Sequence, residues 1–265
     1  MFPKELLPLF PWMAGFLGLI LGSFYTVCVH RYLTEQSIVF PASHCPHCKA
    51  KLRWWENIPL LSYILLGGRC SHCKTPISWR YPLMEALSCA WAVAVAVKFG
   101  PGLTWLALMA VGGVFLVASF IDLVLFILPD FLTYPGAVLG VATGIFGLGL
   151  TWDQSLLGAG FGFGLFWLLR FVHMHIRGVE GLGLGDVKLM AMIGGLTGWM
   201  GLPAAVLFAA VGALALAPVF RLAARREAQG EQGPMRIPFG PFLCLGCMAA
   251  LLWGEGFMRL MAGKM

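Results

Sequence analysis

Two aspartates in apolar surroundings are the residues of this 265-residue chain with the clearest potential for chemistry. Asp186 follows the glycine-rich segment 181–185 and precedes a long apolar run. Asp122 is the other acidic residue that interrupts a strongly apolar run, at 117–125. An ionisable group in a membrane segment is costly, so its default interpretation is functional. We therefore treat Asp122 and Asp186 as a candidate catalytic pair.

A pair of carboxyl groups can hydrolyse an amide bond. The ionised carboxylate takes a proton from water while the protonated partner donates a proton toward the carbonyl oxygen. Two like charges close together do not easily ionise at once, which favours this division of roles. Gly183 and Gly185 are predicted to form an active-site turn, because residues without a Cβ let a substrate strand or a neighbouring helix approach Asp186.

Residue chemistry alone leaves two other uses of the aspartates open. They can be structural, with Asp186 capping the helix that follows it and Asp122 pairing with Lys188 or an interfacial arginine. Buried carboxylates also form proton relays in transporters. Asp130 is a competing first carboxylate, but its position in a turn before a helix favours an N-capping role.

The elements that must position these residues are membrane helices. The chain is 59% hydrophobic and 11% charged, and its mean hydropathy is +0.83, which is typical of a polytopic membrane protein. We predict an all-α fold of about eight transmembrane helices with a small zinc-ribbon-like domain, because each crossing needs roughly 20 apolar residues. The expected spans are 7–29, 82–97, 103–128, 132–150, 156–171, 187–199, 202–220 and 239–261. The first is expected to be retained, since it is too long and poorly flanked for a cleaved signal peptide.

The distribution of charge predicts the domains and the orientation. The segment 31–82 is polar and basic, so we expect a first transmembrane helix at 1–30, a cytoplasmic domain at 31–82 and a helical bundle at 83–265. The bias of Lys and Arg toward cytoplasmic loops places both aspartates on that side and both termini opposite. The net charge of +6 therefore reports topology in a lipid bilayer, and no basic stripe interleaved with aromatics indicates nucleic acid.

Four cysteines form a second chemical motif. Cys45 and Cys48 make one C-x-x-C pair, Cys70 and Cys73 make another, and the spacing is close to that of a zinc ribbon. Four thiolates satisfy tetrahedral Zn²⁺, so we predict a closed structural zinc site that stabilises a domain with little apolar core. Disulfides are the alternative, but they require an oxidising compartment. A third pair, in the last span, is interpreted as apolar filler.

Taken together, the motifs resemble those of the prepilin peptidases, the type IV leader peptidases of the Gly-x-Gly-Asp aspartyl protease class. The resemblance covers most of the chain and rests on segments 21–24, 30–31, 56–63, 68–70, 77–85, 121–122, 128–130 and 183–189, together with the two cysteine pairs.

The resemblance implies a function and a site. By position, the family's catalytic aspartates correspond to Asp122 and Asp186. The implied substrates are type IV prepilins or type II secretion pseudopilins, whose basic leader is cut after a glycine at the cytoplasmic face of the bacterial inner membrane. Many members then methylate the new amino group with S-adenosylmethionine. The resemblance does not locate the site for this methyl donor, which we expect near the cytoplasmic domain.

Two functions of other classes compete with this one. A non-enzymatic carrier or proton-coupled protein with a partner-binding zinc ribbon explains buried carboxylates, but it gives no reason for the glycine turn. A thiol redox protein would cycle its C-x-x-C pairs between thiols and disulfides, and stable tetrahedral metal would count against it.

Overall fold

The structure is a computed structural model that describes residues 3–40, 42–178, 182–227 and 238–261. Several basic residues on which the expected membrane orientation depends lie outside this description, either entirely or in their side chains. They are Lys4, Arg177, Arg221, Arg225, Arg226, Arg236, Arg259 and Lys264.

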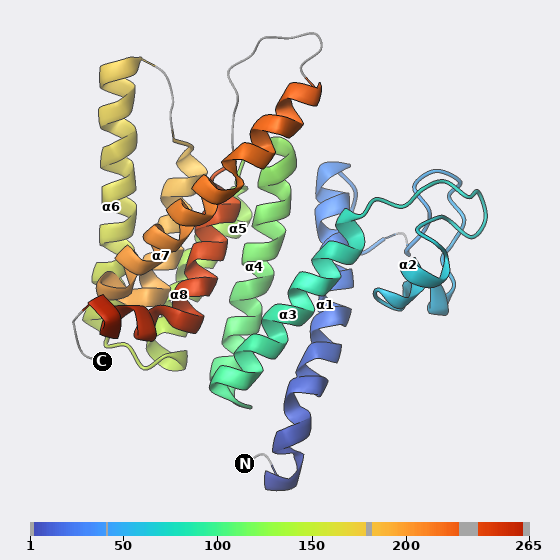
Figure 1. Ribbon diagram of the computed structural model, residues 1–265, viewed down its shortest axis with the longest axis horizontal. Coiled ribbons are helices and arrows are strands. Elements are labelled where there is room, and N and C mark those ends of the chain that lie inside the picture. The colour runs from blue at the N-terminus through green and yellow to red at the C-terminus, as the bar shows by residue number, and fades with distance from the viewer. Residues whose placement is uncertain (1–2, 41, 179–181, 228–237, 262–265) are drawn as a thin grey trace. The chain divides into compact units, whose positions relative to one another are not determined.

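The regular secondary structure of the described residues is helical (Figure 1), apart from two isolated β-bridges in the cysteine-bearing segment, residues 34–79 between α1 and α3. The main helices are α1 (Phe10–Leu33), α3 (Arg80–Phe99), α4 (Leu103–Leu125), α5 (Asp130–Ala142), α6 (Trp152–Arg177), α7 (Leu184–Glu227) and α8 (Gly240–Met261). The shorter ones are η1 (Lys4–Leu9), η2 (Trp54–Asn57), α2 (Leu61–Leu65) and η3 (Thr143–Gly147). An all-α membrane fold is thereby confirmed.

Five of the described helices are long and apolar enough to cross a membrane, namely α1, α3, α4, α6 and α7. Two shorter segments complete the set, namely α5, which η3 extends, and α8, whose part Gly240–Gly254 is apolar. α7 is broken at Gly198, whose φ of 67° is readily adopted by a residue without a Cβ. The two halves of α7 correspond to the separate spans expected at 187–199 and 202–220. With α7 counted as two segments, the main helices of the described residues number eight, as predicted.

The chain divides into two compact units, and the first comprises residues 1–117. In this unit α1 packs closely on α3, because a Cβ on Gly22 would lie 2.7 Å from the Cα of Glu85. The buried carboxylate of Glu85 also accepts a hydrogen bond of 2.7 Å from the backbone N–H of Leu60. The cysteine-bearing segment is thereby tied to the helical hairpin.

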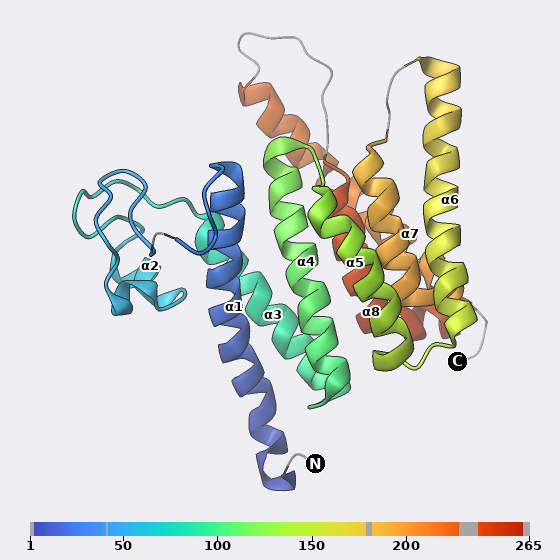
Figure 2. The same ribbon diagram turned by 180° about the vertical axis from the view of Figure 1, so that it is seen from behind.

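The second unit, residues 118–265, contains the end of α4 and helices α5 to α8. Figure 2 shows α7 lying between α5 and α6, and α7 packs on both. Gly158 and Gly162, four residues apart on α6, contact the backbone of α7 at Gly194 and Met190. This supports the interpretation that glycines within the spans allow close helix packing.

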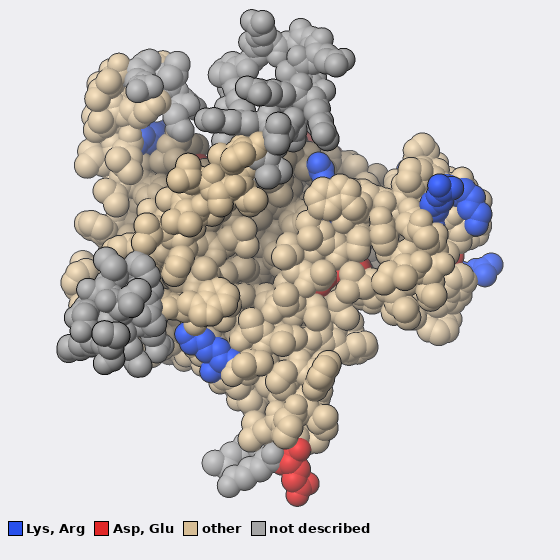
Figure 3. All heavy atoms as spheres, in the orientation of Figure 1, with Lys and Arg blue, Asp and Glu red and all other residues tan. Residues whose placement is uncertain are grey.

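The surface agrees with a membrane protein that has a polar appendage. On the face shown in Figure 3, uncharged residues cover most of the described helical surface, whereas several basic side chains gather on the cysteine-bearing segment. The exposed basic residues of that segment are Lys49, Lys51, Arg53, Arg69 and Lys74.

Candidate active site and metal centre

Asp122 lies in the last turn of α4 and is 5% exposed. Its Oδ2 accepts a hydrogen bond of 3.1 Å from the backbone N–H of Gly240, the first residue of α8. The N-terminus of a helix carries unpaired N–H groups and a partial positive charge, so it is a favourable neighbour for a carboxylate. A Cβ on Gly240 would lie 2.7 Å from the same oxygen, so a larger residue would displace Asp122.

Asp186 lies in the first turn of α7, which begins at Leu184 rather than at Val187 as expected. It is therefore not the residue that precedes the helix. The backbone N–H of Gly183, just before the helix, is close enough to interact with the Asp186 carboxylate. Asp186 thus also lies beside a backbone donor at a helix start.

The fold brings these two carboxyl groups together from different helices. Asp122 and Asp186 belong to the same unit and are close enough for the charge of Asp122 to act on Asp186. Their assignment as the catalytic pair stays a prediction.

Leu128, in the linker between α4 and α5, packs against backbone beside both aspartates. A Cβ on Gly185 would lie 2.6 Å from the Cβ of Leu128, and a Cβ on Gly240 would lie 3.3 Å from its Cδ1. Gly185 therefore allows the α4–α5 linker to approach the start of α7. Gly183 differs, because a Cβ there would approach Asp186 Oδ2 no closer than 3.4 Å.

Lys188 pairs with Asp130, the competing carboxylate. Its Nζ lies 2.6 Å from Asp130 Oδ1 and 4.6 Å from the centre of the Tyr134 ring. The structure thus pairs Lys188 with Asp130 and not with Asp122, the partner that the structural interpretation of the aspartates expected. The expected N-capping by Asp130 is also wrong, since Asp130 is the first residue of α5 and the cap position is Pro129, which has no side-chain cap. The structure thus assigns Asp130 to an ion pair.

The four predicted metal ligands converge in the first unit. The sulfur atoms of Cys45, Cys48, Cys70 and Cys73 all lie within 4.8 Å of one another, and those of Cys45 and Cys73 are 3.8 Å apart. Tetrahedral zinc with Zn–S bonds near 2.3 Å requires sulfur separations of about 3.8 Å. The quartet therefore fits a zinc ion with little adjustment, and it is the one group of potential ligands this close together among the described residues.

The two cysteine pairs adopt the same local structure. In each pair the first cysteine carbonyl accepts a hydrogen bond from the lysine four residues later, and both lysines, Lys49 and Lys74, have positive φ. Hydrogen bonds from Thr75 lower the pKa of the Cys73 thiol to about 6, whereas desolvation and hydrogen bonds with the neighbouring thiols raise the pKa of Cys48 to about 11. The thiolate is the form that binds metal, so metal binding would release protons from this cluster.

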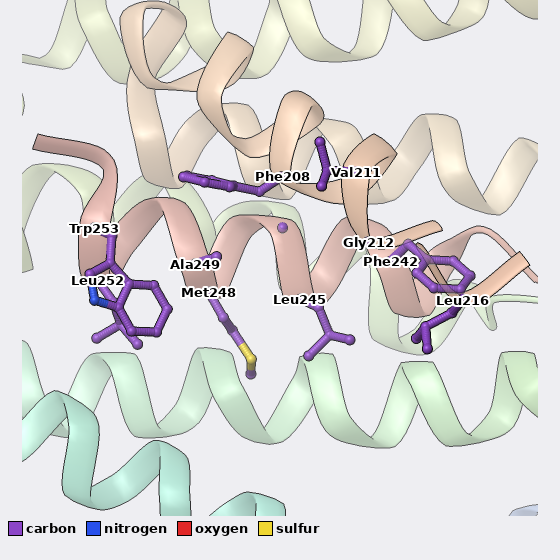
Figure 4. A pocket seen from close by; sticks show the side chains of 11 residues that line it. Phe208, Val211, Gly212, Leu216, Phe242, Leu245, Met248, Ala249, Leu252 and Trp253 are labelled. Carbon is purple, nitrogen blue, oxygen red and sulfur yellow. The ribbon is translucent and has the colours of Figure 1, made fainter. Parts of the chain in front are cut away.

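The unit that contains the aspartates also has an apolar groove of about 420 Å³ between α7 and α8 (Figure 4). It extends from Phe242 and Leu216 to Trp253. No titratable side chain lines it. The groove therefore offers apolar contact rather than catalysis.

Comparison with known proteins establishes the family. Residues 106–218 match the model described as Type IV leader peptidase family, and residues 16–99 match the Bacterial Peptidase A24 N-terminal domain. A protein named prepilin leader peptidase/N-methyltransferase from Burkholderia pseudomallei is 38% identical over 93% of this chain and 86% of its own. One of that name from Pseudomonas aeruginosa is 38% identical over 92% of this chain and 90% of its own. This chain belongs to the type IV leader peptidase family. No solved structure matches it.

The two family models divide the candidate sites between them. Both aspartates and Leu128 lie in the match to the type IV leader peptidase family, and the four cysteines lie in the match to the N-terminal domain. Membership favours the peptidase interpretation over a carrier or a thiol redox protein.

Sequence reasoning missed Gly240, which lies beyond the segment that matches the leader peptidase model. The signal for it was the dipeptide formed with Pro241, because proline is common in the first turn of a helix and predicts a helix start there. Nothing local indicates that this helix start binds Asp122.

The Gly240→Ala variant is expected to lower leader cleavage by about 10²-fold, because misplacing a reacting group by about 1 Å has a cost of that order. The measurement is the initial rate of precursor cleavage by purified protein. Gly160→Ala is the matched control, since a Cβ on Gly160 would contact nothing within 4 Å. Equal activity of the two variants would show that the Gly240 contact does not position Asp122.

Proposed function

We propose that this chain is an aspartic endopeptidase of the inner membrane that removes the leader from type IV prepilins or from the related pseudopilins. In the same proposal, it then methylates the exposed amino group with S-adenosylmethionine as donor. The observation that carries the peptidase is the pair Asp122 and Asp186, which comes from α4 and α7. Asp122 accepts a hydrogen bond from the N–H of Gly240, and Asp186 lies beside the N–H of Gly183.

The proposed mechanism uses one ionised and one protonated carboxyl group. The ionised group takes a proton from water as the water oxygen attacks the carbonyl carbon of the peptide bond. The protonated group donates its proton to the carbonyl oxygen, which gives a gem-diol intermediate. As the C–N bond breaks, the carboxyl group that took the proton from water passes it to the leaving nitrogen, and the other carboxylate takes back a proton from a gem-diol hydroxyl. The amine leaves, and both carboxyl groups return to their starting states. The N–H group of Gly240 fixes the orientation of the Asp122 carboxyl group for this chemistry.

The cysteine quartet is proposed to hold a structural zinc ion. Cys45, Cys48, Cys70 and Cys73 would supply four thiolates, so no coordination position would be left for a catalytic water. Because the metal joins two knuckles separated in sequence, its binding would stabilise the segment 31–82. We propose that this segment and both aspartates face the cytoplasm, which the bias of basic residues in the sequence supports.

The test of this function is mass spectrometry of a purified prepilin precursor after incubation with the protein in detergent, with and without S-adenosylmethionine. Loss of the leader mass is expected in both reactions, and a methyl mass on the mature product is expected with the donor. Well-folded, zinc-loaded protein that cleaves none of several prepilin and pseudopilin precursors would favour the carrier. Cleavage without any methyl mass would remove the second activity.

A further inference from the structure

The linker between α4 and α5 turns one of its apolar side chains inward. Phe126 and Ile127 are 46% and 51% exposed, whereas Leu128 is 8% exposed. In a membrane protein an apolar side chain can remain exposed to lipid without cost, so the burial of Leu128 reflects specific packing contacts. These contacts are with the starts of α7 and α8, beside Asp186 and Asp122.

Leu128 lies beside the reacting groups. The position that a Cβ on Gly240 would occupy is 3.3 Å from Leu128 Cδ1 and 2.7 Å from Asp122 Oδ2. On the opposite side, three atoms of the Leu128 side chain lie within 3.3 Å of the position of a Cβ on Gly185, which precedes Asp186. The side chain therefore fills space between the backbone next to one aspartate and the backbone next to the other.

The linker is fixed on both sides of Leu128. Before it, the backbone N–H of Phe126 donates a hydrogen bond of 2.9 Å to the carbonyl of Asp122. After it, Pro129 restricts φ and Asp130 forms its 2.6 Å ion pair with Lys188. Movement of Leu128 away from the aspartates is thus restricted by contacts with α4 and α7.

We propose that Leu128 determines the size of the substrate residue that precedes the cleaved bond. The proposal rests on the proposed peptidase function. The carbonyl group of the cleaved bond belongs to the substrate residue that precedes this bond. When the carbonyl group reaches both aspartates, the α-carbon of the same residue and any side chain on it must also fit beside them. Leu128 occupies this space, so glycine is admitted and larger residues are rejected.

The experiment compares precursors that carry Gly, Ala or Val before the cleaved bond, using kcat/KM from the rate of leader release. The unmodified protein is expected to prefer Gly over Ala by about 10²-fold, since a steric difference of one carbon is worth about 10–200-fold. In Leu128→Ala the ratio of kcat/KM for Gly to that for Ala should fall at least about tenfold. Leu128→Met, which conserves volume, should keep the original ratio.

Two controls separate specificity from structural damage. Phe126→Ala alters an exposed side chain of the same linker and should leave the ratio unchanged. Precursors altered at the residue after the cleaved bond should show no comparable gain with Leu128→Ala. A Leu128→Ala variant that loses kcat/KM equally on all precursors, or whose ratio is unchanged, overturns the proposal. Leu128→Val serves the same comparison if the alanine variant does not fold.

The proposal and the peptidase function can fail separately. Absence of cleavage of the glycine precursor by the unmodified protein contradicts the peptidase function itself. Normal cleavage of that precursor, together with an unchanged preference in Leu128→Ala, contradicts the role of Leu128 alone.

Discussion

Replacing Asp186 with asparagine is expected to lower prepilin cleavage by about 10³-fold or more, and Asp122→Asn should do the same. Asparagine keeps the shape of the side chain but can neither take a proton from water nor donate one as a carboxylic acid does. The Gly183 and Gly240 N–H groups would still find an oxygen acceptor, so folding and membrane insertion should persist. Initial rates of leader release in detergent, measured with matched protein amounts, give the result.

The two substitutions should not be additive. Because the carboxyl groups act as a unit, the double variant is expected to be about as inactive as either single one. Asp130→Asn is the matched control, since it removes a nearby carboxylate that is 64% exposed and paired with Lys188. An exposed ion pair contributes about 0–1 kcal/mol, so this control should retain activity within about tenfold. Retention of most activity by either Asp122→Asn or Asp186→Asn would remove that residue from the mechanism.

Replacing Cys45 with serine is the change expected to have the largest effect on stability. A serine hydroxyl is a poor zinc ligand, and the sulfur of Cys45 lies 3.8 Å from that of Cys73 within the quartet. Bound structural zinc contributes on the order of 10 kcal/mol to the folding of a small domain, so the segment 31–82 should lose its metal and become sensitive to protease. Zinc content by elemental analysis and the pattern of limited proteolysis report the two effects.

The effect on activity should be selective. Both aspartates belong to the other compact unit, whereas the site for the methyl donor is expected near the cysteine-bearing segment. Cleavage is therefore expected to fall less than methylation does. Cys89→Ser is the control, because Cys89 is a partly buried cysteine of α3 outside the quartet, and its zinc content should be unchanged. Full zinc occupancy in Cys45→Ser would contradict coordination by four thiolates.

Much of the architecture follows from local sequence properties. Apolar runs long enough to cross a bilayer predict the helices, because the membrane leaves a span few alternatives for satisfying its backbone. The cysteine pairs predict their own cluster in the same way, since each C-x-x-C turn places two thiols on one side and tetrahedral coordination uses four. The aspartates were recognisable because charge is costly in such surroundings.

Other features depend on contacts between residues far apart in the chain. The bond from Gly240 to Asp122 joins the start of α8 to the end of α4, and the ion pair of Lys188 goes to Asp130 rather than to either aspartate of the pair. Neither has a local signature, because hydrophobic periodicity reports which face of a helix is buried but not which helix it meets. Leu128 illustrates the same point, since three apolar residues in a row do not reveal which one is turned inward.

The sequence by itself thus determined the membrane helices, the cysteine quartet and the identity of the two candidate aspartates, because hydrophobicity, spacing and the cost of a charge act locally. The tertiary structure alone decided how those aspartates are held, where α7 breaks at Gly198, and that Leu128 lies beside the pair. Those outcomes depend on how closely particular backbones approach one another, and that is set by the packing of the whole unit.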